Sequence, residues 1–280
     1  MPRARGGRHR RRPPSADTAV GHAEVRADPA RPRAGTLMID GAVHGHVDPQ
    51  DPARLALDYQ DRLAALALAL APDDGGTVLH LGGGAFAIPR AIAVRRPDLH
   101  QPVVARTGAI IRLAQRELGL RPGPGLEVRK ADARKALARI PDDAVDVVVG
   151  DAFEGQETPA HLTTVEFMAD VARVLTPGGA YVVNVVDDQP WGRLGVQVAA
   201  ARAVFADVVA AGSPGVAALR DPGNVFLLAG AALPRRALAA VRSTGRHVIG
   251  YVAPGRLDAL ARRHRPRHDA DGLPDAGWVG

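Results

Sequence analysis

Two acidic residues follow predicted strands at positions that often face a ligand. Asp132 comes after the third predicted strand of a sheet, and Asp151 comes directly after the fourth. Because open α/β sheets bind ligands outside the carboxyl ends of their strands, both carboxylates would point into the same crevice. Asp132 could instead cap the helix predicted for residues 132–139, so both interpretations of Asp132 stay open.

A long loop, residues 150–161, follows the fourth predicted strand. It contains Asp151, Glu154, Glu157 and His161. Loops of this kind often carry functional residues. Acids gathered in a crevice suit a cationic substrate, and a desolvated carboxylate can accept a proton from an amine. The alternative is ordinary solvated charge on a surface loop.

Three consecutive glycines, Gly82, Gly83 and Gly84, end a short apolar strand and precede a predicted helix. Glycine adopts positive φ readily and lacks the Cβ that would keep a ligand away from the backbone. Residues 85–87 complete neither the phosphate-binding pattern G-x-x-x-x-G-K-S/T nor the dinucleotide pattern G-x-G-x-x-G, which argues against nucleoside triphosphate hydrolysis. The alternative is a tight turn without a ligand.

Several polar aromatic side chains have a structural and a functional interpretation. Tyr59, on a helix ahead of the sheet, could hydrogen-bond a ligand while its ring packs, although a plain core tyrosine is the simpler interpretation. His44 and His46 alternate on a predicted strand, but no carboxylate or thiolate partner lies near them, so we interpret them as surface histidines. His80, inside a strand, is predicted to be a core residue.

The elements that position these residues alternate along the chain from residue 77 onward. Predicted strands cover residues 77–81, 103–104, 126–129, 145–149, 180–186, 208–211 and 224–229, and predicted helices cover roughly 86–96, 109–118, 132–139, 163–175 and 190–205. Strands that alternate with helices of about ten residues indicate βαβ units on a parallel sheet. We therefore predict an α/β fold with a doubly wound, mostly parallel seven-stranded sheet.

Composition suggests the limits of the domains. Residues 1–33 are rich in Arg and Pro and are predicted to be a disordered tail, with nine arginines and three acids that account for the whole net charge of +6. Residues 34–50 form a predicted β element with a hairpin turn at Asp40-Gly41. Residues 51–253 form the Rossmann-like domain, and residues 254–280 a C-terminal tail that we expect to be loose after one short helix.

Composition also argues against several classes of function. The basic charge lies in the N-terminal tail and the rest of the chain is balanced, which argues against a folded nucleic-acid-binding surface. The chain has no cysteine, so it has no disulfides and no thiolate metal site. The most apolar stretch, residues 63–72, is too short to span a membrane. We expect a cytoplasmic protein without nucleic-acid or membrane partners and without a metal.

Six segments in order resemble the spermidine synthase (polyamine aminopropyltransferase) family, which has the fold of class I S-adenosylmethionine-dependent methyltransferases. The resemblance runs from about residue 37 to residue 186. The matching segments are Leu37–Gly41, Asp58–Asp61, Val78–Gly84, Ala131–Ala133, Asp151–Glu154 and Pro159–Leu162. The family also pairs through its β elements, so the resemblance allows a homodimer.

The resemblance implies a reaction and its acceptor site. An aminopropyl group would pass from decarboxylated S-adenosylmethionine to a small polyamine such as putrescine. Asp151 would be the general base that deprotonates the attacking amine. Glu154 would bind the diamine, and Tyr59 and Gln60 would help to orient it. Positioning and one base suffice for such a transfer, since the sulfonium is already activated.

The donor site implied by the resemblance departs from the family pattern at two positions. Gly82–Gly84 and Asp132 would contact the donor, Asp132 through its adenine. Ala85 stands where the family has an aspartate for the donor's amino group, and Ala105 stands where an acid holds the ribose diol. Thr107 could replace one ribose contact. Each lost hydrogen bond to a charged group costs about 1.5–3 kcal/mol of binding.

These departures leave the enzymatic status open and support two alternatives. One is a degenerate family member that keeps the fold without catalysis. The other is a methyltransferase that uses ordinary S-adenosylmethionine, because a shared fold does not fix the chemistry.

Overall fold

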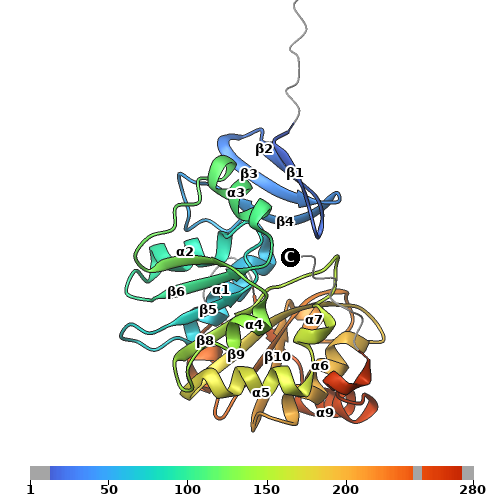
Figure 1. Cartoon of the computed structure of the whole chain (residues 1–280). Helices are drawn as coiled ribbons and strands as arrows, with labels where there is room; N and C mark the ends of the chain where they lie inside the picture. The colour runs from blue at the N-terminus through green and yellow to red at the C-terminus, as the bar shows by residue number, and fades with distance from the viewer. Residues whose placement is uncertain (1–12, 242–247, 273–280) are drawn as a thin grey trace, which may run out of the picture.

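The computed structural model describes residues 13–241 and 248–272. A small antiparallel sheet of four strands comes first, and a mixed sheet of eight strands follows it, with helices on both faces (Figure 1). This architecture confirms the predicted α/β fold with a mostly parallel sheet. Residues 1–12 and 273–280 of the two predicted tails lie outside the described residues.

The N-terminal sheet has the strand order β1-β2-β3-β4. Its strands are β1 (Ser15–Thr18), β2 (Gly21–Asp28), β3 (Arg31–Ile39) and β4 (Ala42–Val47). The predicted hairpin at Asp40-Gly41 joins β3 to β4, and both turn residues have positive φ, 47° and 82°. The small sheet therefore begins about twenty residues earlier than the sequence suggested.

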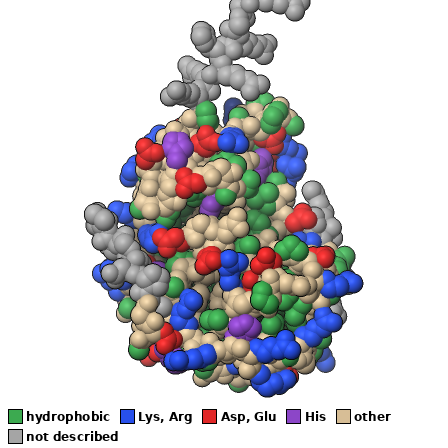
Figure 2. All heavy atoms as spheres, turned by 90° about the vertical axis from the view of Figure 1, so that its right-hand side faces the viewer, with side chains coloured by type: hydrophobic (Ala, Val, Ile, Leu, Met, Phe, Trp, Pro, Cys, Tyr) green, Lys and Arg blue, Asp and Glu red, His purple; other side chains and the backbone are tan. Residues whose placement is uncertain are grey.

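Residues 15–33 were predicted to belong to the disordered tail and instead form strands. Ala23 and Val25 are buried on one side of β2, while Glu24 and Arg26 form an ion pair of 2.6 Å. This alternation is short, and the surrounding Arg and Pro hide it in the composition. The upper part of Figure 2, where this sheet lies, shows acidic and basic side chains interspersed.

The eight-stranded sheet has the order β12-β10-β11-β9-β8-β5-β6-β7. Its strands are β5 (Val78–Leu81), β6 (Gln101–Ala105), β7 (Leu126–Lys130), β8 (Val145–Gly150), β9 (Leu175–Asp187), β10 (Asp207–Gly212), β11 (Gly223–Gly230) and β12 (Gly250–Tyr251). The strands from β7 to β9 are parallel, and β11 is antiparallel to β9 and to β10. The two-residue edge strand β12 was not predicted.

The position of the ligand crevice follows from this strand order. The chain runs outward from β5 through β6 to β7 and then returns to the other side of β5 as β8. Such a reversal leaves a crevice between the carboxyl ends of the two strands on either side of it. Gly82 follows β5 and Asp151 follows β8, so both residues stand at this point.

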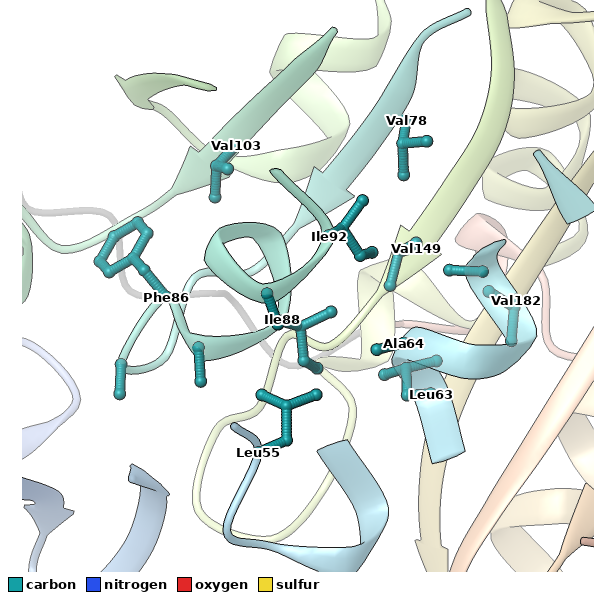
Figure 3. Packing of buried hydrophobic residues seen from close by; sticks show 14 of the residues in the cluster. Leu55, Leu63, Ala64, Val78, Phe86, Ile88, Ile92, Val103, Val149 and Val182 are labelled. Atoms are coloured by element: carbon teal, nitrogen blue, oxygen red, sulfur yellow. The ribbon is translucent and has the colours of Figure 1, made fainter. Parts of the chain in front are cut away.

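Two hydrophobic cores lie on opposite faces of the large sheet. The first contains α1 (Asp58–Leu70), α2 (Ala87–Arg95), α3 (Gly108–Glu117) and α8 (Arg235–Val241). The second contains α4 (Ala133–Leu137), α5 (Val165–Val174), α6 (Gly192–Arg202), α7 (Pro214–Ala217) and α9 (Pro254–Arg263). Figure 3 shows Ile88 and Ile92 of α2 lying between the strands and Leu63 of α1. Helix α3 also contacts β1 and β2, which holds the small sheet over the strand ends.

The C-terminal tail is packed through residue 272, in contrast to the prediction. Leu257 and Leu260 of α9 are buried, and α9 contacts α6. Beyond α9, Asp269 in the short 3-10 helix η2 (Asp269–Asp271) pairs with Arg134 at 2.6 Å. The tail was predicted to be loose because its charged residues dominate, yet their partners lie on α4 and α5 of the sheet domain.

One helix starts later than predicted. Helix α6 begins at Gly192 rather than at residue 190, so Pro190 precedes the helix. The carboxylate of Asp187 accepts the N–H of Leu194, in the first turn of α6, at 2.8 Å. Residues 177–179 lie inside β9, at an irregularity in its register with β8.

Candidate active site

A cavity of about 600 Å³ lies between the small sheet and the carboxyl ends of β5, β6, β7, β8 and β9. This volume is in the range of small-molecule sites, roughly 300–1,000 Å³. On the face seen in Figure 2, hydrophobic side chains gather between the upper and lower parts of the molecule. The predicted site residues in its wall are Tyr59, Gly82, Gly83, Gly84, Thr107, Asp132 and Asp151. Residues far apart in sequence therefore share one hollow.

Asp151 is held at the end of β8 by its neighbours in the sheet. Its backbone N–H donates to the carbonyl of Leu81 at 2.8 Å. Its Oδ1 accepts a hydrogen bond of 2.9 Å from Nδ2 of Asn184 on β9. The Oδ1 of Asn184 in turn accepts one of 3.0 Å from Nδ2 of Asn224 on β11. Three neighbouring strands thus fix the direction of this carboxylate into the cavity.

The surroundings of Asp151 favour its protonated form. Burial raises the pKa of Asp151 to about 6, although the hydrogen bond from Asn184 acts in the opposite direction. A carboxylate with a pKa near the working pH can both accept and release a proton. Asp151 therefore combines a place in the cavity wall with a raised pKa, which suits proton exchange with a group that enters the cavity.

Tyr59 lies in the cavity wall near Asp151. Burial raises the pKa of the Tyr59 hydroxyl, and the negative charge of Asp151 raises it further. The hydroxyl stays protonated and accepts a hydrogen bond of 3.3 Å from Nε2 of Gln60. Gln60 is itself buried at 2% exposure and is not part of the wall. Tyr59 can thus contact a ligand, while Gln60 acts on it only through Tyr59.

The three glycines have packing roles as well as a place in the wall. A Cβ on Gly82 would lie 2.3 Å from the backbone oxygen of Asp151, and one on Gly84 would lie 2.9 Å from the carbonyl of His44. Gly83 is covered by the ring of Phe86, which lies in the core and does not fill the cavity. A tight turn alone therefore accounts for these glycines, and the ligand argument rests on the cavity beside them.

Asp132 caps a helix, which is one of the two interpretations that the sequence left open, and it also lies in the cavity wall. Its Oδ1 accepts the N–H groups of Arg134 and Lys135 and caps α4. Its Oδ2 lies 3.0 Å from Nε2 of His161, which also lines the cavity. Burial alone would raise the pKa of Asp132, but the hydrogen bonds from His161 and the backbone lower it below its usual value. Asp132 is therefore in the wall, with both oxygens already engaged.

Glu154 is not in the cavity wall, although it was predicted to bind the diamine. Its side chain is 52% exposed and pairs at 3.0 Å with Arg106, which does line the cavity. The loop after Asp151 folds into a short turn in which Glu154 and Glu157 bond to one another through the backbone. The partner of Glu154 comes from the end of β6, 48 residues away.

The two alanines of the donor side differ in position. Ala105 lines the cavity at the end of β6, so the wall has a methyl group there. Ala85 is 1% exposed, lies outside the wall, and packs so closely on Gly45 that a Cβ there would approach it to 2.7 Å. Only position 105 could therefore offer a polar group to a ligand without rearrangement.

Three residues of the wall were missed or misread in the sequence. Asn184 is an amide in the middle of an apolar strand, which is a usable signal, whereas nothing marks Asn224. His44 was predicted to be a surface residue and lines the cavity. His46, predicted likewise, is buried and lies 3.1 Å from the Thr36 hydroxyl. The prediction for His80 is confirmed, since it is buried with Nε2 3.1 Å from Gln101.

Two further searches of the described residues bear on function. In residues 13–241 and 248–272, no three side chains among His, Asp and Glu gather as they would around a metal ion. None of the helices in these segments combines the length and apolarity that crossing a membrane requires.

Comparison with known proteins gives matches in sequence and in fold. No protein-family model matches the chain. A polyamine aminopropyltransferase of Vibrio vulnificus is 30% identical over 139 residues, which cover 49% of this chain and 46% of that protein. One of Chromobacterium violaceum is 30% identical over 150 residues, 51% of this chain and 54% of that protein. The chain thus spans about half the length of the curated relatives that it matches.

The fold comparison covers almost the whole chain. The crystal structure of a probable spermidine synthase from Corynebacterium glutamicum matches with a TM-score of 0.83 and 25% identity, over 92% of this chain and 96% of that one. In sequence and in fold the chain is similar to the spermidine synthase (polyamine aminopropyltransferase) family, and its fold is of the S-adenosylmethionine-dependent methyltransferase-like type.

Proposed function

We propose that this protein transfers an aminopropyl group from decarboxylated S-adenosylmethionine to the primary amine of a small acceptor, with the polyamine putrescine as the acceptor that the family suggests. One observation carries the proposal: the carboxylate of Asp151, with its pKa raised to about 6, lies in the wall of a cavity beside the glycine turn. A base of this kind is what an amine nucleophile requires.

The chemistry needs little more than a proton acceptor and alignment. When bound, the donor supplies a carbon activated by its sulfonium. Asp151 takes the proton that the acceptor's ammonium must lose, and Asn184 keeps that carboxylate directed into the cavity. The nitrogen lone pair then forms the new C–N bond as the C–S bond breaks and methylthioadenosine leaves. Tyr59 stays protonated and can donate a hydrogen bond to the acceptor.

The residues present fit the donor in part. Gly82–Gly84 leave the wall open to close approach of an adenosyl group, and Thr107 offers a hydroxyl there. Ala105 offers none, and Asp132 has no uncommitted oxygen. We therefore expect weak donor binding, with an affinity reduced by roughly 10- to 100-fold for each missing charged contact.

Ala105 also supports a second candidate, a non-catalytic family member that no longer binds an adenosyl donor. The two candidates differ in a binding measurement. Calorimetric titration with decarboxylated S-adenosylmethionine gives saturable heat if the cavity retains donor affinity. Flat titrations with both this donor and ordinary S-adenosylmethionine would favour the non-catalytic protein. Preferential binding of ordinary S-adenosylmethionine would favour a methyltransferase.

Activity is tested by incubating the pure protein with decarboxylated S-adenosylmethionine and amine acceptors, and by measuring methylthioadenosine. We expect product with the native chain and none with Asp151→Asn, which keeps the size of the side chain. Glu166→Gln on α5, away from the cavity, is a matched control and should retain the native rate. If no acceptor, whether diamine or monoamine, gives methylthioadenosine, the proposed reaction is wrong.

A further inference from the structure

The charges in the cavity wall limit which amine can bind there. Within the described part of the chain, the carboxylates of the wall are Asp132 and Asp151. Both oxygens of Asp132 already accept hydrogen bonds, from His161 and from the N-terminus of α4. Asp151 is therefore the single carboxylate left for an ammonium group.

The side of the cavity formed by the N-terminal sheet is mostly apolar and carries no carboxylate. Val20, Ile39, Ala42 and Val43 contribute to it, Leu57 continues it ahead of α1, and His44 is its polar member. An ammonium group against such a surface gives up part of its hydration and meets no opposite charge there. An alkyl or aryl group placed there gains free energy in proportion to the apolar area that it buries.

The remaining charge in the wall also opposes a second cation. Arg106 lines the cavity and is held there by Glu154 at 3.0 Å. Glu154 itself is not one of the wall residues, and its charge is balanced by this pair. A diamine would thus have one end at Asp151 and its other end among apolar side chains and a guanidinium.

From this juxtaposition of one uncommitted carboxylate with an apolar wall, we infer that the acceptor is a primary monoamine with an apolar body, an alkylamine or arylalkylamine, rather than a diamine. This inference rests on the proposed transfer reaction and replaces putrescine, the acceptor that the family suggests, by a monoamine. Asp151 binds the ammonium and accepts its proton, and the apolar wall binds the rest of the molecule.

A pair of ligands of equal length tests the inference directly. n-Pentylamine and putrescine share a primary amine and a four-carbon chain, and differ in a terminal methyl in place of the second ammonium. Binding to the full-length protein is measured by calorimetric titration. We expect n-pentylamine to bind at least about tenfold more tightly than putrescine, and Asp151→Asn to weaken its binding. Equal or tighter binding of putrescine would overturn the inference.

A carboxylate added to the apolar wall should reverse the preference for n-pentylamine over putrescine. Val43 lies in the wall on β4 and is 51% exposed, so a longer side chain is tolerated there. Val43→Glu should strengthen putrescine binding relative to n-pentylamine by about tenfold, whereas Val43→Gln, of the same size, should not. Val94→Glu on α2, at 55% exposure and outside the wall, is a matched control. An unchanged ratio in Val43→Glu would count against the apolar wall as the binding surface.

Methylthioadenosine formation separates this inference from the proposed function. Product with n-pentylamine and little with putrescine supports both. Product with putrescine at an equal or higher kcat/KM would support the transfer reaction and contradict the preference for a monoamine. Selective binding of n-pentylamine without any product supports the inference and contradicts the transfer reaction.

Discussion

The two sides of the cavity differ in the polar side chains that they carry. At the ends of β8, β9 and β11, Asp151, Asn184 and Asn224 form a chain of hydrogen bonds of 2.9 and 3.0 Å. At the ends of β5 and β6, alanines (Ala85 and Ala105) occupy the two positions where the resemblance implies acids. Buried polar groups that lack partners are costly, so the hydrogen bonds at the first side hold its three polar side chains in place.

This difference separates the contacts available to an acceptor from those available to a donor. On the proposed acceptor side, the position of Asp151 depends on three strands, whereas the proposed donor side has no carboxylate at position 85 or 105. If the proposed transfer is correct, donor binding is therefore its weaker step. The four predictions below separate the two sides, and they run from the largest expected effect to the smallest.

The largest effect is expected at the acceptor side. Asp151→Asn should lower kcat for methylthioadenosine formation by about 10²–10⁴-fold, since general-base catalysis contributes that much. Glu154→Gln should lower it little, because Glu154 lies outside the cavity wall. Steady-state kinetics measures both variants. A loss in Glu154→Gln as large as that in Asp151→Asn would place the catalytic carboxylate in the loop instead of at the end of β8.

The second effect concerns stability and is independent of any substrate. The pKa of Asp151 is about 6 in the folded protein, above the value of 3.8 for a free aspartate. The stability that this group contributes is therefore present below pH 4 and is lost as the pH rises through 6. The free energy of unfolding of Asp151→Asn relative to the native chain should rise by about 2–3 kcal/mol between pH 4 and pH 7.

Urea unfolding at several pH values measures this difference. The matched control is Asp142→Asn, at an exposed carboxylate on the opposite side of the sheet domain from the cavity wall. Its difference from the native chain should not grow with pH. A flat difference for Asp151→Asn as well would contradict a desolvated carboxyl group at this position.

The sequence predicted one side of this comparison better than the other. The pattern of strands and helices predicted the fold, the crevice and the place of Asp151 within it. Local periodicity shows where each strand ends and in which order strands and helices follow along the chain. The pattern did not predict that Glu154 would turn to Arg106, because that pair depends on a loop conformation that sequence spacing does not encode. The role of Asn224 depends on the pairing of β9 with β11, which is likewise set by tertiary contacts.

The N-terminal strands were missed for a related reason. Arg and Pro dominate the composition of residues 1–33, so the short alternation around Ala23 and Val25 is hidden. These residues are buried only because β3 covers β2 and α3 packs on both β1 and β2. The contribution of Ile39 and Val43 to the cavity follows from that packing. The acceptor preference inferred above could therefore not have been derived from the sequence.

The third effect concerns the donor side, where a substitution adds a carboxylate. Ala105→Glu should place a carboxylate in the cavity wall and tighten binding of decarboxylated S-adenosylmethionine by about 10- to 100-fold, in line with a regained charged hydrogen bond. Calorimetric titration measures the change. Ala85→Asp should behave differently, because position 85 is buried outside the wall, and should lower the melting temperature without tightening the donor. An Ala105→Glu variant with native affinity would show that the ribose does not lie at the end of β6.

The smallest effect is a shift in the pKa of Asp151. Asn184→Ala removes the hydrogen bond that favours the charged form of Asp151, so the pKa of Asp151 should rise above 6. The acidic limb of the pH profile of kcat/KM should move upward by about one pH unit. Asn224→Ala, which contacts Asp151 only through Asn184, should move it less. Equal shifts in the two variants would show that Asn224 does not act on Asp151 through Asn184.

The protonation of Asp151 is most directly followed by NMR titration of ¹³C-labelled carboxyl groups, with Asp151→Asn to assign the signal. The account predicts that the Asp151 carboxyl titrates near pH 6 in the free protein, because it faces the cavity and is shielded from bulk water. A midpoint below about 4, as for an exposed aspartate, would contradict a desolvated base at the end of β8 and with it the proposed transfer.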